Sequence, residues 1–243
     1  YEFHANGPTH INLEFDEPLL SDDRSNWLED LASDELLSER LLQEELVIPS
    51  GKGIVIAGHD SVDVSELVAQ LQVPLIAENP LSYSNALAHA PLFSVQLEID
   101  WAIVAGRTTL SRSTNSLIAK AKEVFVIDSK AARIDPKRSA TKIFSTIPKL
   151  IGRAEPWSIN SEYISIQEWC EPAVAQCIAE QLPIGSTLYV SSSRPIRDLE
   201  AFAKPRSGVE VFANRGLAGI DGNLSTAIGI ASKRDCTYAV VGD

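Results

Sequence analysis

The residues whose types and spacing most clearly suggest chemistry form a glycine-rich loop near the carboxyl end of the chain. Gly216, Gly219 and Gly222 follow a short apolar stretch that is typical of the end of a buried strand. A helix of small residues is expected to begin near Asn223. Because glycine exposes backbone N–H groups and a helix N-terminus carries partial positive charge, this pattern favours a bound phosphate. A tight turn packed against a neighbouring helix fits the same spacing, so the spacing alone does not distinguish a phosphate-binding loop from a structural turn.

Three arginines stand at expected strand or helix ends. Arg215 adjoins the glycine loop, Arg197 lies in the stretch SSSRPIRDLEAF, and Arg112 begins an expected helix. Planar guanidinium groups bind carboxylates through two parallel hydrogen bonds, so the arginines predict acidic ligands. No salt-bridge partner for Arg215 is evident nearby in sequence, whereas Asp198 and Glu200 are close enough to pair with Arg197. An ordinary surface charge remains an equal alternative for Arg112.

Short apolar runs separated by polar, helix-forming stretches must position these residues. The runs are GIVIAG, VPLIA, WAIVAG, EVFVID and STLYVSS. Continuous apolar runs of this length indicate parallel strands covered on both faces. We therefore predict an α/β fold with a Rossmann-like, doubly wound parallel sheet over residues 46–184. Neither AGHDSV nor AGRTTL contains the G-x-G-x-x-G pattern, so dinucleotide binding is not expected.

Less regular segments flank this central region. Residues 21–45 are leucine-rich and acidic and predict one or two amphipathic helices. Residues 167–182 predict a long helix, and its cysteines, Cys170 and Cys177, are expected to be buried packing residues too far apart for a disulfide. The final stretch, TYAVVGD, predicts a buried parallel strand.

Composition excludes several classes of protein. The 243-residue chain has a net charge of −12 and no basic stripe, which argues against nucleic-acid binding. It has no run of ~20 apolar residues and no signal-peptide pattern, and its three cysteines suit a reducing compartment, so a cytoplasmic location without membrane insertion is expected. The absence of methionine and the strand at the very end suggest an interior piece of a longer protein.

SSSRPIRDLEAF and NRGLAGIDGNLSTAIG resemble the signature of 2-succinyl-5-enolpyruvyl-6-hydroxy-3-cyclohexene-1-carboxylate (SEPHCHC) synthases. These are thiamine-diphosphate enzymes of menaquinone and phylloquinone biosynthesis. The resemblance implies that residues 1–20 end a pyrimidine-binding domain and that residues 46–184 form a central domain without cofactor. Residues 185–243 would then begin a truncated diphosphate-binding domain, with residues 21–45 as an acidic linker.

The resemblance also implies a reaction and its residues. The family decarboxylates 2-oxoglutarate and adds the succinyl semialdehyde unit to isochorismate, using thiamine diphosphate and Mg²⁺ or Mn²⁺ in a homodimer or homotetramer. Ile220 would be the wedge that bends the cofactor, and Asp243 would begin the metal site. The remaining implied site residues are Arg112, Ser193, Arg197 and Arg215 for substrate, and Gly219, Asp221 and Gly242 for cofactor.

The activating glutamate and the second metal ligand would lie outside this chain, so the isolated chain is expected to be inactive. A second hypothesis belongs to another class of protein. It is a non-catalytic α/β module whose glycine loop holds a phosphate or nucleotide without turnover. Only the enzyme requires a glutamate before this stretch and a metal-binding asparagine after it.

Overall fold

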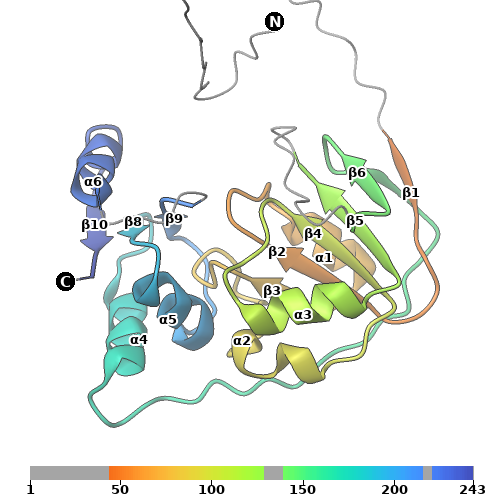
Figure 1. The fold of residues 1–243 in the computed structure, drawn as a ribbon, viewed down its shortest axis with the longest axis horizontal. Helices are drawn as coiled ribbons and strands as arrows, with labels where there is room; N and C mark the ends of the chain where they lie inside the picture. The colour runs from red at the N-terminus through yellow and green to blue at the C-terminus, as the bar shows by residue number, and fades with distance from the viewer. Residues whose placement is uncertain (1–43, 129–138, 216–220, 243) are drawn as a thin grey trace, which may run out of the picture. The chain divides into compact units, whose positions relative to one another are not determined.

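The central feature is a five-stranded sheet in which every pair of neighbouring strands is parallel. The computed structural model describes residues 44–128, 139–215 and 221–242, all within one compact unit (Figure 1). The strand order is β3-β2-β4-β5-β6. The first strand therefore has its successors on both sides, which confirms the predicted doubly wound topology. The strands are β2 (Gly53–Ala57), β3 (Leu75–Ala77), β4 (Trp101–Ala105), β5 (Glu123–Ile127) and β6 (Lys142–Phe144).

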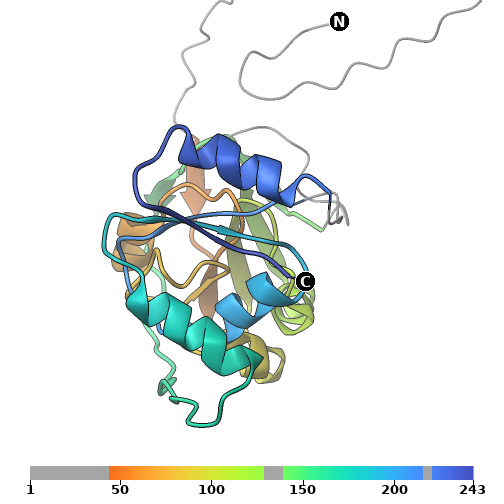
Figure 2. The same ribbon diagram turned by 90° about the vertical axis from the view of Figure 1, so that its left-hand side faces the viewer.

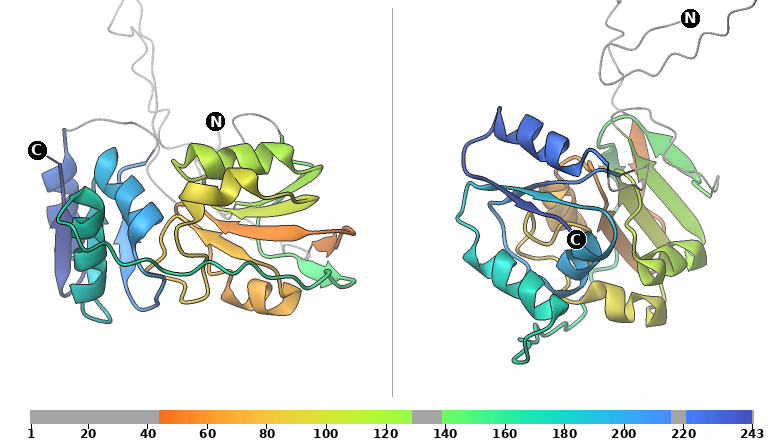
Figure 3. Two further views of the ribbon diagram at one scale, coloured as in Figure 1. Left: turned by 90° about the horizontal axis from the view of Figure 1, so that it is seen from below. Right: turned by 60° about the vertical axis from the view of Figure 1, so that its left-hand side comes forward.

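Helices cover both faces of this sheet, which explains why its strands read as continuous apolar runs. Alternate strand residues such as Val55 and Ile103 pack with α1 (Ser65–Leu71) on one face. Their neighbours, including Ile54, pack on the other face with α3 (Arg112–Lys120) and the short α2 (Ala90–Phe93). Figure 3 shows α2 and α3 on the face of the sheet opposite α1. A 3₁₀ turn, η2 (Ser94–Gln96), follows α2.

A second, three-stranded parallel sheet has the order β10-β8-β9. Figure 2 shows α4 and α5 on one side of this sheet and α6 on the other. Leu188 and Val190 of β8 share a core with Ile196 of α5 and Ala179 of α4. The bounds are α4 (Glu171–Gln181), β8 (Thr187–Val190), α5 (Arg194–Phe202), β9 (Glu210–Phe212), α6 (Asn223–Ala231) and β10 (Thr237–Val240). Two further strands, β1 (Glu45–Val47) and β7 (Lys149–Ile151), pair in parallel.

Two expectations about burial are wrong. β10 has the predicted position and direction, but as an edge strand it is only partly buried, and Tyr238 is 44% exposed. All three cysteines are free and exposed. The helix that carries Cys177 instead buries Ala173, Ala175, Gln176 and Ala179. The side chain of Gln176 is held there by hydrogen bonds with the backbone of Ile164 and Ile166. The predicted domain boundaries at residues 20, 45 and 184 stay predictions.

The carboxyl ends of β2 and β4 meet at the switch of the central sheet. The Gly58 N–H donates to the Ala105 carbonyl, and His59 and Arg107 form a bridge beyond both strands. A Cβ at position 58 would lie 1.6 Å from the Arg107 carbonyl oxygen, so this crossing requires glycine. In doubly wound sheets such a crevice is where ligands bind.

Candidate functional site

A cavity of about 630 Å³ lies between the N-terminus of α3 and α5. Its volume is within the range of about 300–1,000 Å³ that is usual for small-molecule sites. The cavity brings together residues from three segments of the chain, at position 91, positions 110–113 and positions 194–201. The lining consists of Pro91, Leu110, Ser111, Arg112, Ser113, Arg194, Arg197, Asp198, Glu200 and Ala201.

The α3 side of the cavity is rigidly built. Ser111 occupies the N-cap position, and its hydroxyl accepts a hydrogen bond from the Thr114 N–H at 3.1 Å. The Thr109 hydroxyl in turn accepts from the Ser111 N–H at 3.0 Å. Arg112 then begins the helix and is exposed, as the sequence predicts. A cation at a helix N-terminus is unfavourable by itself, because the helix dipole is positive there. An anion in the cavity would be attracted both by the Arg112 guanidinium and by the positive end of the α3 dipole.

The α5 side contributes two arginines with different partners. Arg194 binds the buried carboxylate of Asp198 through its Nε at 2.7 and 2.8 Å and lies 3.7 Å from Glu171. Arg197 is exposed and has no hydrogen bond or ion pair with any residue that the structure describes. The pairing of Asp198 with Arg197 that sequence proximity allows is therefore not made. Arg197 remains available to a ligand.

Glu200 also lines this cavity. The sequence indicates for it only an ion pair with Arg197 at the surface. Its residue is 4% exposed, and its Oε1 has no hydrogen-bond partner within the described part of the chain. Burial, with the nearby carboxylate of Glu78, raises the pKa of Glu200 to about 8, although Thr109 and Arg215 act in the opposite direction. The carboxyl group is therefore predominantly protonated at neutral pH.

Arg215 is not in this cavity but is buried beside it. Its Nε donates to Glu78 Oε1 at 2.9 Å and its Nη2 to Glu78 Oε2 at 3.2 Å and to the Thr108 carbonyl at 2.9 Å. The two side chains are 10% and 3% exposed. Burial raises the pKa of Glu78 above its ordinary value and Arg215 offsets this in part, while the bidentate contact places the guanidinium charge against both oxygens of the Glu78 carboxyl group. This partner is 137 residues away in sequence, where no local inspection finds it.

The other predicted site residues lie apart from the cavity lining. Ser193 is exposed at the N-cap position of α5, with φ 92° and no capping bond from its side chain. Asp221 is exposed just before α6, whose N-cap is Gly222 with φ 81°. Gly242 is exposed after β10. Gly219, Ile220 and Asp243 lie outside the described residues.

The described residues contain no group of three or more histidine, cysteine or acidic side chains arranged to hold a metal ion. Asp243, the predicted first metal ligand, is not among them. In the same part of the chain, no helix has both the length and the apolar character needed to cross a bilayer.

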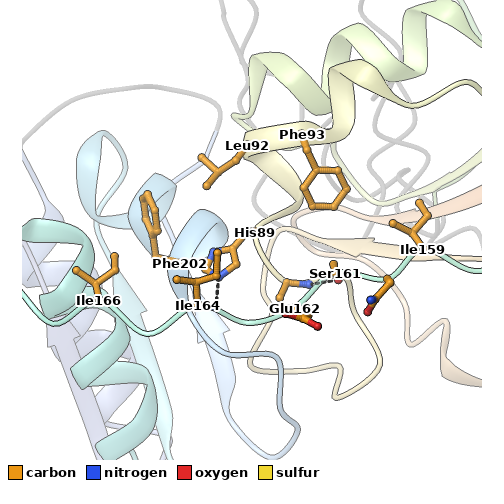
Figure 4. Close-up of a pocket in the computed structure, with 11 residues that line it drawn as sticks. His89, Leu92, Phe93, Ile159, Ser161, Glu162, Ile164, Ile166 and Phe202 are labelled. Carbon is orange, nitrogen blue, oxygen red and sulfur yellow. Dashed lines mark hydrogen bonds between the residues drawn. The ribbon is translucent and has the colours of Figure 1, made fainter.

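A second cavity, of about 600 Å³, is mainly apolar and is organised around His89 (Figure 4). The His89 Nδ1 donates to the Ala201 carbonyl at 2.8 Å, and its Nε2 accepts from the Ile164 N–H at 3.0 Å. The imidazole thereby joins α2, the end of α5 and the extended segment that precedes α4. His89 was missed in the sequence because no neighbouring residue signals its partners. These bonds give it a structural role.

No family model matches the chain. Curated SEPHCHC synthases do match it. Those of Thermobifida fusca (strain YX) and Nocardioides sp. (strain ATCC BAA-499 / JS614) are 29% and 32% identical to it, over 98% and 94% of this chain. A third, from Saccharopolyspora erythraea, is 28% identical over 98%. The chain spans about half the length of these relatives, 48–50%. The resemblance inferred from the two sequence signatures is confirmed.

Proposed function

The chain is a relative of the SEPHCHC synthases over nearly all of its own length, and from that premise we propose that it is part of such an enzyme. The complete protein would decarboxylate 2-oxoglutarate and add the succinyl semialdehyde unit to isochorismate, in the synthesis of menaquinone or phylloquinone. One observation carries the proposal. Arg112 and Arg197, predicted separately, line a single cavity large enough for a small acidic molecule.

The charge in this cavity suits the proposed substrates, both of which are carboxylates. Arg112 and Arg197 have no protein partner within the described residues, so their guanidinium groups can each bind a ligand carboxylate bidentately. Ser111, fixed by its capping bond, holds the backbone from which Arg112 projects. Ser193 and Arg215 remain proposed substrate contacts for the complete enzyme, and the buried pair with Glu78 would hold Arg215 in position.

Thiamine diphosphate, with Mg²⁺ or Mn²⁺, would supply the carbanion-stabilising chemistry of the reaction. The described residues nearest to the predicted cofactor site fit a diphosphate. The N-terminus of α6 has no side-chain cap, and nothing lies within 4 Å of a Cβ position at Gly222. Asp221 and Gly242 would hold the cofactor together with Gly219 and Ile220, and Asp243 would hold the metal ion.

Two further elements of the proposal concern the surroundings of the protein. We place it in the cytoplasm, which its three free cysteines support. We also propose a homodimer or homotetramer for the complete enzyme, in which another subunit completes the cofactor site. The second candidate, a non-catalytic phosphate-binding module, is favoured only by the uncapped N-terminus of α6.

The test uses the complete protein that contains this chain, supplied with thiamine diphosphate and Mg²⁺. We expect product from 2-oxoglutarate and isochorismate, and a decrease in kcat/KM of about 10- to 150-fold in Arg112→Ala and in Arg197→Ala, from loss of a charged hydrogen bond. The control is Arg153→Ala, which removes an exposed arginine outside the cavity and should change nothing. Binding of thiamine diphosphate without any turnover would favour the non-catalytic module instead.

A further inference from the structure

Glu200 is a buried acid in a cavity otherwise suited to anions. Among the described residues three buried side-chain polar atoms lack a hydrogen-bond partner, and Glu200 Oε1 is the titratable one. An unpaired buried polar atom is costly, so such atoms in native proteins require an explanation. Here the atom belongs to a residue that lines the cavity together with Arg112 and Arg197. A bound ligand is the natural source of the missing partner.

The buried charged groups around Glu200 already have partners of their own. From the ends of the central strands, Glu78 faces it with a carboxylate and Thr109 with a hydroxyl. Arg215, which follows β9, uses its Nε and Nη2 on Glu78. On α5 itself, Arg194 pairs with Asp198. Across the cavity, α3 presents Arg112, which is exposed.

This arrangement leaves two acids, Glu78 and Glu200, near one buried guanidinium. Because Arg215 binds both oxygens of Glu78, the Glu78 carboxylate is the compensated charge. A second negative charge on Glu200 would be desolvated and close to the first, which is why the proton stays on Glu200. A carboxylic acid in this state has one O–H donor to offer.

We propose that Glu200 is a hydrogen-bond donor to the acidic ligand, its carboxyl O–H binding an oxygen of the molecule whose carboxylate Arg112 and Arg197 hold. The proposal deepens the proposed function and rests on it, since it names the ligand class of that cavity. The ligand is a small carboxylate with a second acceptor oxygen, such as a 2-oxo acid. Ionised Glu200 would repel the same ligand, so the proton on Glu200 determines specificity.

The first experiment reads the protonation state directly and requires no activity. Infrared difference spectra between the complete wild-type protein and its Glu200→Gln variant isolate the carboxyl band of Glu200. We expect the band of the protonated acid at pH 7 and its loss as pH rises through about 8. Glu162→Gln, which changes an exposed carboxylate lining the other cavity, should give no such band. Absence of the protonated band at pH 7 would overturn the proposal.

The second experiment measures kcat/KM for 2-oxoglutarate as a function of pH in the same proteins. Wild-type activity should fall above about pH 8, where Glu200 ionises. Glu200→Leu, which has no donor, should lose about 10-fold or more at pH 7. Glu200→Gln retains an N–H donor and should recover part of that loss while its activity no longer falls at high pH. Identical pH profiles in wild type and Glu200→Gln would contradict the donor role.

The two proposals can fail separately. If the wild-type protein makes no product, the proposed function fails, whereas the infrared titration and calorimetric binding of 2-oxoglutarate at pH 7 and pH 9 still test Glu200. If product forms but neither Glu200 variant differs from Glu162→Gln in either measurement, the inference about Glu200 alone is wrong. Should Glu200→Leu fail to fold, the near-isosteric Gln variant decides the outcome.

Discussion

Arg215, which follows β9, and Arg197, which lies within α5, have the same side chain but opposite surroundings. Arg215 is 10% exposed and bound through two nitrogens to a carboxylate of the central sheet. Arg197 is exposed in the cavity and unpaired within the described residues. The charge of Arg215 is compensated, so this side chain contributes to stability whether or not it also contacts substrate, whereas the charge of Arg197 is left for a ligand. Removing Arg215 should therefore change mainly the stability of the protein, and removing Arg197 mainly its catalytic activity.

The largest effect is expected on stability at the buried pair. Arg215→Ala removes the guanidinium partner of the buried Glu78 carboxyl group, so we expect a loss of about 3–5 kcal/mol in the free energy of unfolding. Urea unfolding of the complete protein measures it. The double variant Arg215→Met with Glu78→Leu should restore most of that loss, because no charge is then left buried. A loss below about 1 kcal/mol in Arg215→Ala would mean that the pair is open in solution and would remove the contrast with Arg197.

The complementary effect is expected on catalysis at the exposed arginines. Arg197→Ala and Arg112→Ala should leave the free energy of unfolding within about 0.5 kcal/mol of wild type, as surface changes usually do. Each should weaken transition-state binding by about 1.5–3 kcal/mol when steady-state kinetics are measured with each substrate varied in turn. Arg197→Lys should recover only part of the loss, since an ammonium lacks the bidentate fork. Alanine variants that lose stability but keep kcat/KM would make these arginines structural.

The sequence predicts the parts of this contrast that depend on local pattern. The apolar runs locate β2, β3, β4, β5 and β8 because burial on both faces demands continuous apolar residues. The start of α3 at Arg112 follows from its capping serine. The β1 and β6 strands were missed since each is three residues long and partly exposed.

Long-range pairing could not be predicted in the same way. Glu78 and Arg215 are brought together only by the packing of one strand end against another, which no local spacing records. Glu200 is three residues from Arg197 and was therefore interpreted as a surface partner. The groups that act on its carboxyl, Thr109 and Glu78, follow strands of the central sheet and are distant from Glu200 in sequence. The exposed cysteines were mispredicted because alanines, rather than the larger apolar residues, form the buried side of α4.

A smaller effect, on the pH dependence of stability, should distinguish Glu200 in the cavity from Glu78 in the buried ion pair. Since the pKa of Glu200 is raised from 4.5 to about 8 in the folded protein, the folded state binds more protons than the unfolded state between those values. Its contribution to stability is complete below about pH 4.5 and is lost as pH rises through about 8. Glu200→Gln removes this dependence. Its stability relative to wild type should therefore grow between pH 6 and pH 7 by at most ~1.4 kcal/mol.

Chemical unfolding of both proteins at fixed ionic strength from pH 5 to pH 9 measures that difference. The exposed Glu162→Gln variant should show no such trend with pH. A difference between Glu200→Gln and wild type that stays constant over this range would place the pKa of Glu200 near its ordinary value. Glu200 would then be ionised at neutral pH and could not donate a hydrogen bond to an acidic ligand.

The smallest effect concerns Ser193, where backbone and side chain make separate contributions. Its φ of 92° and ψ of −130° suit glycine and strain a residue with a Cβ, and its hydroxyl makes no capping bond that would offset the strain. Ser193→Gly should therefore raise the free energy of unfolding by ~1 kcal/mol, the relief of strain exceeding the added freedom of the unfolded chain. Ser193→Ala keeps the strain and removes only the hydroxyl, so it should have wild-type stability. Both variants remove the hydroxyl that is proposed to bind substrate, so both should lower kcat/KM. Strain at Ser193 fits this role, because strained residues are retained where function needs their geometry. Equal stability of the glycine and alanine variants, measured by urea unfolding, would show that the backbone at Ser193 is unstrained, and the hydroxyl alone would then account for any change in activity.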